Sequence, residues 1–289
     1  METEKVFELL KDQVQTFSED NPHIRSFVIG LSGGIDSAIV AALVNAAICD
    51  RKLKCKLLGY SIPADSNKKD EVDRSFDVGT AFCDEFHYDE DFMALLYKSY
   101  KDWLDVSGYI RKEAKLELTE KIRLGNIKAR IRMIHLFDMA KQNEGIVLST
   151  DNLTEYLLGF WTLHGDVGNF GLIQNLWKSE VYELSAFLVD RFNEVGFHNG
   201  AQALSKCAKA VPTDGLGISG SDFDQLGAGS YGEIDQILMT WIFRLEGWAQ
   251  YKDHPVIQRH KATRFKRNDP LNVERKKLGL QLALNNLTI

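Results

Sequence analysis

Residues 26–37 read SFVIGLSGGIDS, and this stretch decides the fold prediction. An apolar run from Phe27 to Leu31 stops at Ser32-Gly33-Gly34, and a helical apolar pattern restarts from Asp36. This order predicts a strand, a tight glycine turn and the N-terminus of a helix. Glycines in such a turn let backbone N–H groups approach an anion, and the helix that follows adds its positive end. The simpler interpretation is an ordinary turn between a strand and a helix.

The side chains of this turn favour a pyrophosphate-binding loop. Ser32 and Ser37 can donate hydroxyl groups to phosphate oxygens, and Asp36 is placed to hold a magnesium ion between them. The loop is not a Walker loop, because no G-x-x-x-x-G-K-[ST] occurs in the chain. It resembles the S-G-G-x-D-S loop of the ATP pyrophosphatase superfamily, whose enzymes cut ATP between the α- and β-phosphates. The resemblance implies ATP contacts along the whole segment: Gly30, Leu31, Ser32, Gly33, Gly34, Ile35, Asp36 and Ser37.

Composition places the chain among soluble globular proteins. Its 289 residues are 44% hydrophobic and 26% charged, and the formal net charge of −6 argues against a nucleic-acid partner. The four cysteines show neither CxxC pairing nor zinc spacing, so we expect reduced thiols in a cytoplasmic protein. No apolar stretch approaches ~18 residues and no signal peptide is evident, so no membrane partner is expected.

The apolar periodicity predicts strands that alternate with helices. The expected strands after the first are 56–62, 85–88 and 146–149. The expected helices are 3–19, 38–48, 68–83, 91–104 and 111–142, with a further helix N-capped by Asp151. The alternation predicts an α/β fold with a doubly wound, mostly parallel sheet flanked by helices, in one domain over 1–289. Ligands of such sheets bind at the carboxyl ends of the strands. The glycine-rich residues 215–232 predict a flexible lid, and a helical region is expected at 234–262.

Further segments match one family in order. Residues 125–133 read GNIKARIRM, residues 149–155 read STDNLTE, and Gly165-Asp166 precede a lysine at 178. Pro212-Thr213 and the basic stretch from Thr263 to Pro270 follow. With the glycine turn, these segments resemble ammonia-dependent NAD synthetase from about residue 4 to residue 270. The resemblance implies ATP contacts at Thr150, Lys178 and Thr213, and magnesium ligands at Asp36 and Glu155.

The acceptor is expected to meet two basic residues. A helical wheel places Ile127, Ile131, Ile134 and Phe137 on one apolar arc with Arg130 inside it, and Arg132 on the opposite side. An arginine on a buried stripe must be paired, because an unpaired buried charge is costly. The resemblance implies that Arg130 and Lys266 orient the acceptor. A structural salt bridge is the alternative for Arg130, and a solvated acid in the first turn of a helix is the alternative for Glu155.

The chain departs from the family pattern at three places, all on the acceptor side. Leu163 stands where the family usually has a lysine, the substrate-binding aspartate of the family aligns with Asn169 or Phe170, and Phe265 replaces a histidine. The positions that match the ATP side are intact. We therefore expect Leu163, Phe170 and Phe265 to form an acceptor pocket that is more apolar than usual.

The resemblance implies ATP-dependent amidation of the nicotinate carboxylate of deamido-NAD by ammonia, through an acyl-adenylate, in a homodimer. The length leaves no room for a fused amidase domain, so free ammonia or ammonia from a separate protein is expected. The departures favour, as an alternative, the same chemistry on nicotinate mononucleotide or another carboxylate. A tRNA-modifying enzyme of the same superfamily would share the loop, but the acidic net charge and the lack of a cysteine pair argue against it. A nucleotide-binding paralogue without catalysis would share the fold, but the intact magnesium ligands argue against it.

Overall fold

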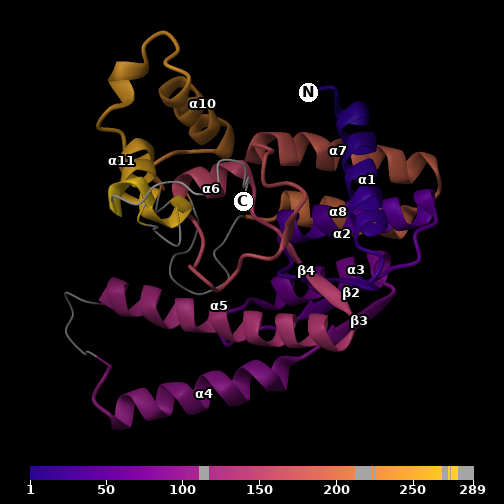
Figure 1. Ribbon diagram of the computed structural model, residues 1–289, viewed down its shortest axis with the longest axis horizontal. Helices are drawn as coiled ribbons and strands as arrows, with labels where there is room; N and C mark the ends of the chain where they lie inside the picture. Colours follow the sequence, from indigo (N-terminus) through magenta and orange to yellow (C-terminus); the bar gives the residue numbers. More distant parts are fainter. Residues whose placement is uncertain (111–116, 212–222, 224–225, 269–272, 274, 279–289) are drawn as a thin grey trace.

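The structure is a computed structural model that describes residues 1–110, 117–211, 223, 226–268, 273 and 275–278 (Figure 1). Along the chain the elements are α1 (Thr3–Asp20), β1 (Ser26–Gly30), α2 (Ile35–Arg51), β2 (Lys56–Ser61), α3 (Lys69–Phe82), β3 (Glu85–Tyr88), α4 (Glu90–Val106), α5 (Glu117–Gln142), β4 (Gly145–Ser149), α6 (Leu153–Leu158), β5 (Phe170–Gly171), α7 (Lys178–Glu194), α8 (His198–Lys209), α10 (Tyr231–Ile242), η2 (Trp248–Tyr251), α11 (Pro255–Ala262), η3 (Arg264–Asn268) and η4 (Arg275–Leu278).

The five strands form one parallel sheet in the order β3-β2-β1-β4-β5. The chain builds outward from β1 to β3 and then returns to the other side of β1 with β4. The strand order therefore reverses between β1 and β4, and such a reversal opens a crevice at the carboxyl ends of the two strands. Val28 pairs with Val147, so the two strands end close together. The predicted doubly wound parallel sheet is confirmed.

Helices cover both faces of the sheet (Figure 1). One apolar cluster joins the sheet to α1, α2, α3, α7 and α8, and a second joins the opposite face to α4 and α5. The helix α2 can lie flat on the sheet because its inward residues are small, as Ala38, Ala41 and Ala42 show. A third cluster joins α6, α10 and α11 beside the sheet, at the upper left of Figure 1.

The predicted strands and helices as far as β4 correspond closely to the observed ones. The helices α7 and α8 were not predicted, and the helical region expected at 234–262 is divided into α10, η2 and α11. The short strand β5 was not predicted, because two residues carry no periodicity. Residues 111–116 of the helix expected at 111–142 lie outside the described part of the chain. Residues 215–222 and 224–225 of the expected lid also lie outside it. Within the expected lid, Leu226 and Tyr231 are buried in the third cluster, and Tyr231 begins α10.

No helix among the described residues is both long enough and apolar enough to cross a membrane.

Candidate active site

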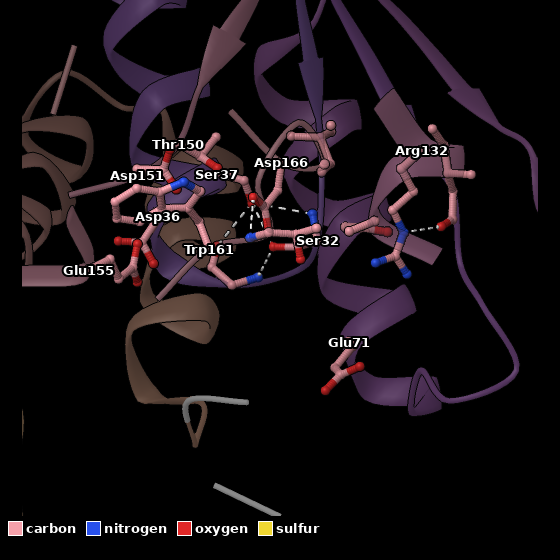
Figure 2. A pocket seen from close by; sticks show the side chains of 18 of the residues that line it. Ser32, Asp36, Ser37, Glu71, Arg132, Thr150, Asp151, Glu155, Trp161 and Asp166 are labelled. Atoms are coloured by element: carbon pink, nitrogen blue, oxygen red, sulfur yellow. Dashed lines mark hydrogen bonds between the residues drawn. The ribbon is translucent and has the colours of Figure 1, made fainter. Parts of the chain in front are cut away.

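A pocket of about 420 Å³ lies at the carboxyl ends of β1, β2 and β4, where the strand order reverses. The loop after β1, the loop after β2, one face of α5, the segment after β4 and Lys178 line it. Figure 2 shows Asp36, Glu155 and Trp161 on one side of the pocket, and Arg132 and Glu71 on the other. Side chains more than a hundred residues apart in sequence thus face one volume.

The serines of the loop after β1 are tied together by hydrogen bonds. The backbone N–H of Ser32 donates to Ser37 Oγ at 3.3 Å, and the two hydroxyl oxygens lie 3.2 Å apart. Ser37 Oγ also lies 3.3 Å from the carbonyl oxygen of Gly34. Gly33 has φ 77°, the left-handed conformation that glycine adopts without strain. Of the segment predicted to bind ATP, all residues except Gly33 line the pocket.

Lys178 bridges the two carboxylates that the sequence assigns to magnesium. Its ammonium group contacts Asp36 Oδ2 and lies 3.1 Å from Glu155 Oε1, and its side chain is 3% exposed. Burial disfavours a charged lysine, but the charges of Asp36 and Glu155 outweigh burial and raise the pKa of Lys178. Burial also raises the pKa of Glu155, against the attraction of Lys178. A cation therefore sits where the two carboxylates converge.

Asn152, and not Asp151, is the N-cap of α6. Its side-chain oxygen accepts from the Glu155 N–H at 3.0 Å, and its amide group donates to Asp36 Oδ1 at 2.9 Å. The prediction for Asp151 was wrong by one residue, because aspartate and asparagine are both good caps and the sequence offers them in succession. Asn152 thereby connects the start of α6 to the start of α2.

Two further carboxyl groups are buried beside the pocket. Asp151 accepts a hydrogen bond from Ser149 Oγ at 2.9 Å, and Asp166 accepts from the Thr162 N–H at 2.8 Å. Burial raises the pKa of each to about 7. Both groups line the pocket.

The helix α5 presents Arg132 to the pocket, and not Arg130. The buried residues Met133, Leu136 and Ala140 of α5 pack toward the sheet. Arg130 is exposed and donates to the carbonyl of Leu163, so its predicted place on the buried face is wrong.

The wheel failed because it assumed that every isoleucine and phenylalanine of α5 faces the core. Ile134 and Phe137 are exposed. Arg132 donates to the Ile62 carbonyl at 3.0 Å and to Asn67 Oδ1 at 2.8 Å (Figure 2). It is thus the arginine of α5 that lines the pocket.

Lys266 lines the pocket but is bound to the backbone of the segment after α6. Its ammonium group donates to the Gly159 carbonyl at 2.7 Å and to the Trp161 carbonyl. His260 Nδ1 and Arg267 Nη1 both donate to the Leu157 carbonyl, each at 2.7 Å. The basic stretch near the C-terminus therefore satisfies the carbonyl groups that α6 leaves unpaired at its end.

The three departures on the acceptor side do not form one surface. Phe170 stacks on Phe17 with ring centroids 4.6 Å apart, packs against the core under α1 and α2, and is absent from the pocket lining. Leu163 and Phe265 are absent from the pocket lining, and Phe265 is 52% exposed. Strand β5 pairs with β4 at the sheet edge and turns Phe170 toward the core, which alignment alone could not reveal.

Of the remaining predicted ATP contacts, Thr150 and Lys178 line the pocket, and Thr213 lies outside the described residues. No group of three or more metal-ligating side chains occurs in the part of the chain that the structure describes. Asp36 and Glu155 nevertheless form a pair that converges on one point, and magnesium usually takes one or two carboxylates together with substrate phosphates. The donor set fits an ion that arrives with a nucleotide.

Comparison with known proteins shows the family. The sequence model of NAD synthase matches residues 2–270 of the chain. The chain belongs to the NAD synthase family. It is 28% identical over 279 residues to the NH3-dependent NAD synthetase of Thermoplasma acidophilum, covering 95% of this chain and 98% of that one.

Two solved structures resemble this NAD synthase family member over most of its length. The NH3-dependent NAD synthetase of Campylobacter jejuni superposes with a TM-score of 0.66 at 26% identity, covering 95% of this chain and all (100%) of that one. The NMN synthetase of Francisella tularensis superposes with a TM-score of 0.72 at 23% identity, covering 95% and 99%. At that identity the second likeness shows the fold alone.

The site contains residues to which the sequence analysis assigned no role in binding. Arg132, Asp151, Asp166 and Trp161 all line the pocket. Asp151 directly follows a strand, at the position where ligands bind in such sheets, and this was a usable signal. Trp161 stacks on Tyr156 with rings 5.6 Å apart and nearly parallel, a contact that no local pattern predicts.

Phe170→Ala tests whether this ring serves the core or the acceptor. We expect the free energy of unfolding to fall by about 2–4 kcal/mol, because a stacked and largely buried ring is removed. The KM for the acceptor should stay within about twofold of wild type. Urea unfolding and steady-state kinetics give the two values. Phe265→Ala, at an exposed ring, is the matched control and should change stability by less than ~0.5 kcal/mol. A raised acceptor KM in Phe170→Ala with unchanged stability would show that Phe170 contacts the acceptor.

Proposed function

We propose that this member of the NAD synthase family amidates the nicotinate carboxylate of deamido-NAD with ammonia and converts ATP to AMP and pyrophosphate. The observation that carries the proposal is the convergence of the serine loop, the Lys178 ion pairs and the half-buried Arg132 on one pocket. The family match supports a ligase that forms a C–N bond. The ionised carboxylate attacks the α-phosphate, pyrophosphate leaves, and ammonia then displaces AMP from the acyl-adenylate.

The ATP half of the pocket is assigned by chemistry. The loop from Ser32 to Ser37 offers hydroxyl and N–H groups to the phosphates, and the helix α2 begins directly behind it. Beyond the loop, Ile62, Met133 and Val147 give an apolar surface suited to a purine ring. We therefore expect the phosphates of ATP at the loop and its purine ring on this apolar surface.

Magnesium is proposed as the accompanying ion, held by Asp36 and Glu155. When bound with ATP, it would neutralise charge on the phosphates and on the leaving pyrophosphate. Lys178 now neutralises both carboxylates and is long enough to turn its ammonium group toward a phosphate instead. Catalysis by these groups is electrostatic, because a carboxylate nucleophile needs no base.

On the acceptor side, Arg132, Lys266 and Trp161 are the groups that the pocket offers to an anionic, aromatic ligand. Trp161 presents an aromatic surface, and the Lys266 ammonium lies 5.4 Å from the centre of its ring. Asp151 is suited to take a proton from the attacking ammonia, because its pKa is raised to about 7. Arg130 is exposed on α5, and its contact with the acceptor remains a prediction.

A homodimer in the cytoplasm is proposed as the working form. Large apolar side chains are exposed along α4 and α5, which lie side by side at the lower edge of Figure 1. They are Leu95, Leu96, Tyr100 and Trp103 on α4, and Leu118, Ile122, Ile134 and Phe137 on α5. An apolar surface of this extent is typical of a protein interface.

The second candidate is the same reaction on nicotinate mononucleotide. The observation that favours it is the departure of Leu163 and Phe265 from the family pattern. The proposed chemistry is unchanged, since both acceptors carry the nicotinate carboxylate.

Kinetics with both acceptors decide between the two candidates. We expect AMP release with ATP, magnesium and ammonium to show a kcat/KM for deamido-NAD at least about tenfold above that for the mononucleotide, because the larger acceptor makes more contacts. A reversed preference would assign the second candidate. If a protein that still binds ATP releases no AMP with either acceptor, the amidation proposal itself is contradicted.

A further inference from the structure

The helix α3 packs directly on the glycine loop. A Cβ atom added to Gly33 would lie 2.1 Å from the carbonyl oxygen of Glu71, in the first turn of α3. Glu71 is itself buried and accepts hydrogen bonds from Asn67 and from the Lys68 N–H. The backbone of α3 therefore forms the wall behind the loop.

From this wall, Arg74 reaches the loop backbone. Its Nε donates to the carbonyl oxygen of Gly33 at 2.8 Å, and its Nη1 donates to Asp70 Oδ2 at 2.6 Å. The Arg74 side chain is 14% exposed and lines the pocket. Because a guanidinium group is planar and rigid, these two bonds at different nitrogens fix its orientation.

Because the peptide is planar, the hydrogen bond from Arg74 to the Gly33 carbonyl also fixes the direction of the Gly34 N–H. The carbonyl of Gly33 and the N–H of Gly34 belong to one planar trans peptide and point in opposite directions. The Gly34 N–H is directed to Ser32 Oγ, 3.2 Å away, and both residues line the pocket. Holding the carbonyl toward α3 therefore holds the N–H toward the serine hydroxyl and the pocket.

We propose that Arg74 is a positioning residue for the phosphate-binding loop: it fixes the Gly33–Gly34 peptide in the orientation that receives the pyrophosphate group of ATP. The proposal rests on the proposed function in taking ATP as the source of that group. Arg74 acts through the peptide, and Asp70 acts through Arg74.

A purely structural ion pair is the competing explanation. Asp70 is 67% exposed and lies four residues before Arg74 on the same helix, and exposed pairs of this kind contribute little to stability. If the pair served only α3, its loss would leave nucleotide binding unchanged. The two explanations therefore differ in phosphate affinity and not in melting temperature.

The test measures phosphate binding without turnover. Wild type, Arg74→Gln, Arg74→Lys and Asp70→Asn are titrated with pyrophosphate and with ATP by calorimetry, and KM is measured for ATP and for the acceptor. We expect Arg74→Gln to weaken pyrophosphate binding and raise the ATP KM by about 10- to 100-fold, the size of one lost hydrogen bond to a charged donor. Arg74→Lys and Asp70→Asn should lose less, in the same direction, and the acceptor KM should stay within about twofold.

The matched control is Lys206→Gln, which breaks a 2.7 Å ion pair between α8 and Asp77 of α3 without touching the loop. It should bind pyrophosphate as wild type does. The proposal is overturned if Arg74→Gln binds pyrophosphate normally, if Arg74→Lys is fully equivalent to wild type, or if both KM values rise together with a lowered melting temperature. The titration needs no acceptor. A wild-type protein that binds pyrophosphate but amidates no nicotinate nucleotide would contradict the proposed function, while the pyrophosphate affinities of the variants could still be compared with that of wild type.

Discussion

Replacing Lys178 with methionine is expected to abolish most of the activity and to destabilise the protein at the same time. The substitution removes the cation that Asp36 and Glu155 share and leaves two carboxylates, only 18% and 16% exposed, without an ion-pair partner in Lys178. Breaking a buried ion pair from one side costs about 3–5 kcal/mol of unfolding free energy. Loss of one fixed charge beside the reacting phosphates should lower kcat by about 10²- to 10³-fold. Chemical unfolding and AMP release measure the two effects.

Lys11→Met is the control that separates the two effects. Lys11 is also a buried lysine that bridges two carboxylates, Glu8 and Asp50, each at 2.7 Å, but it joins α1 to α2 outside the pocket. Its partners are about half exposed, so its loss should cost less stability and leave kcat unchanged. Adding Glu155→Gln to Lys178→Met should restore part of the stability without restoring activity. Full activity in Lys178→Met would remove Lys178 from the proposed mechanism.

Replacing Gly33 with alanine adds only one methyl group but should strongly lower kcat/KM for ATP. Alanine in the left-handed conformation costs about 1–2 kcal/mol, and here its methyl group would also collide with the Glu71 carbonyl. The loop or α3 must therefore move, and a displacement of about 1 Å at a catalytic loop costs roughly 10²-fold in rate. We expect kcat/KM for ATP to fall by about that factor, measured by AMP release at saturating acceptor.

Gly196→Ala is the matched control for strain alone. Gly196 has φ 80°, and nothing lies within 4 Å of a Cβ atom placed there. It should show the modest loss of stability that the left-handed conformation brings, with an unchanged ATP KM. Equal kinetic losses in the two alanine variants would show that strain, and not the contact with α3, explains the Gly33 effect.

The ATP side of the site was predictable because its residues lie in short contiguous motifs. Residues from Gly30 to Ser37 follow a strand and begin a helix, so local backbone preference and position on the sheet agree. Thr150 and Glu155 are placed by a second turn of the same kind. Parallel strands bring the two turns to one edge, so the sequence, once read as alternating strands and helices, predicted their meeting.

The acceptor side was predicted poorly because it depends on side chains that face one another across different elements. Periodicity shows that α5 is a helix, but only its packing between the sheet and α4 decides that Arg132 faces the pocket and Arg130 faces outward. Likewise Phe170 aligned with a substrate-binding position, yet the pairing of β5 at the sheet edge stacks its ring on Phe17. A shift of one residue reverses the direction of a side chain in a strand.

By itself, the sequence determined the doubly wound parallel sheet and the glycine turn between β1 and α2, and the family resemblance supplied the pairing of Asp36 with Glu155. The sheet and the turn depend on local patterns of apolar residues, glycines and caps, which act over a few residues. Only the tertiary structure decided that Lys178 joins the two carboxylates and that Arg74 holds the loop from behind. Those contacts span 142 and 41 residues of sequence, and burial and packing, not local preference, bring such distant groups together.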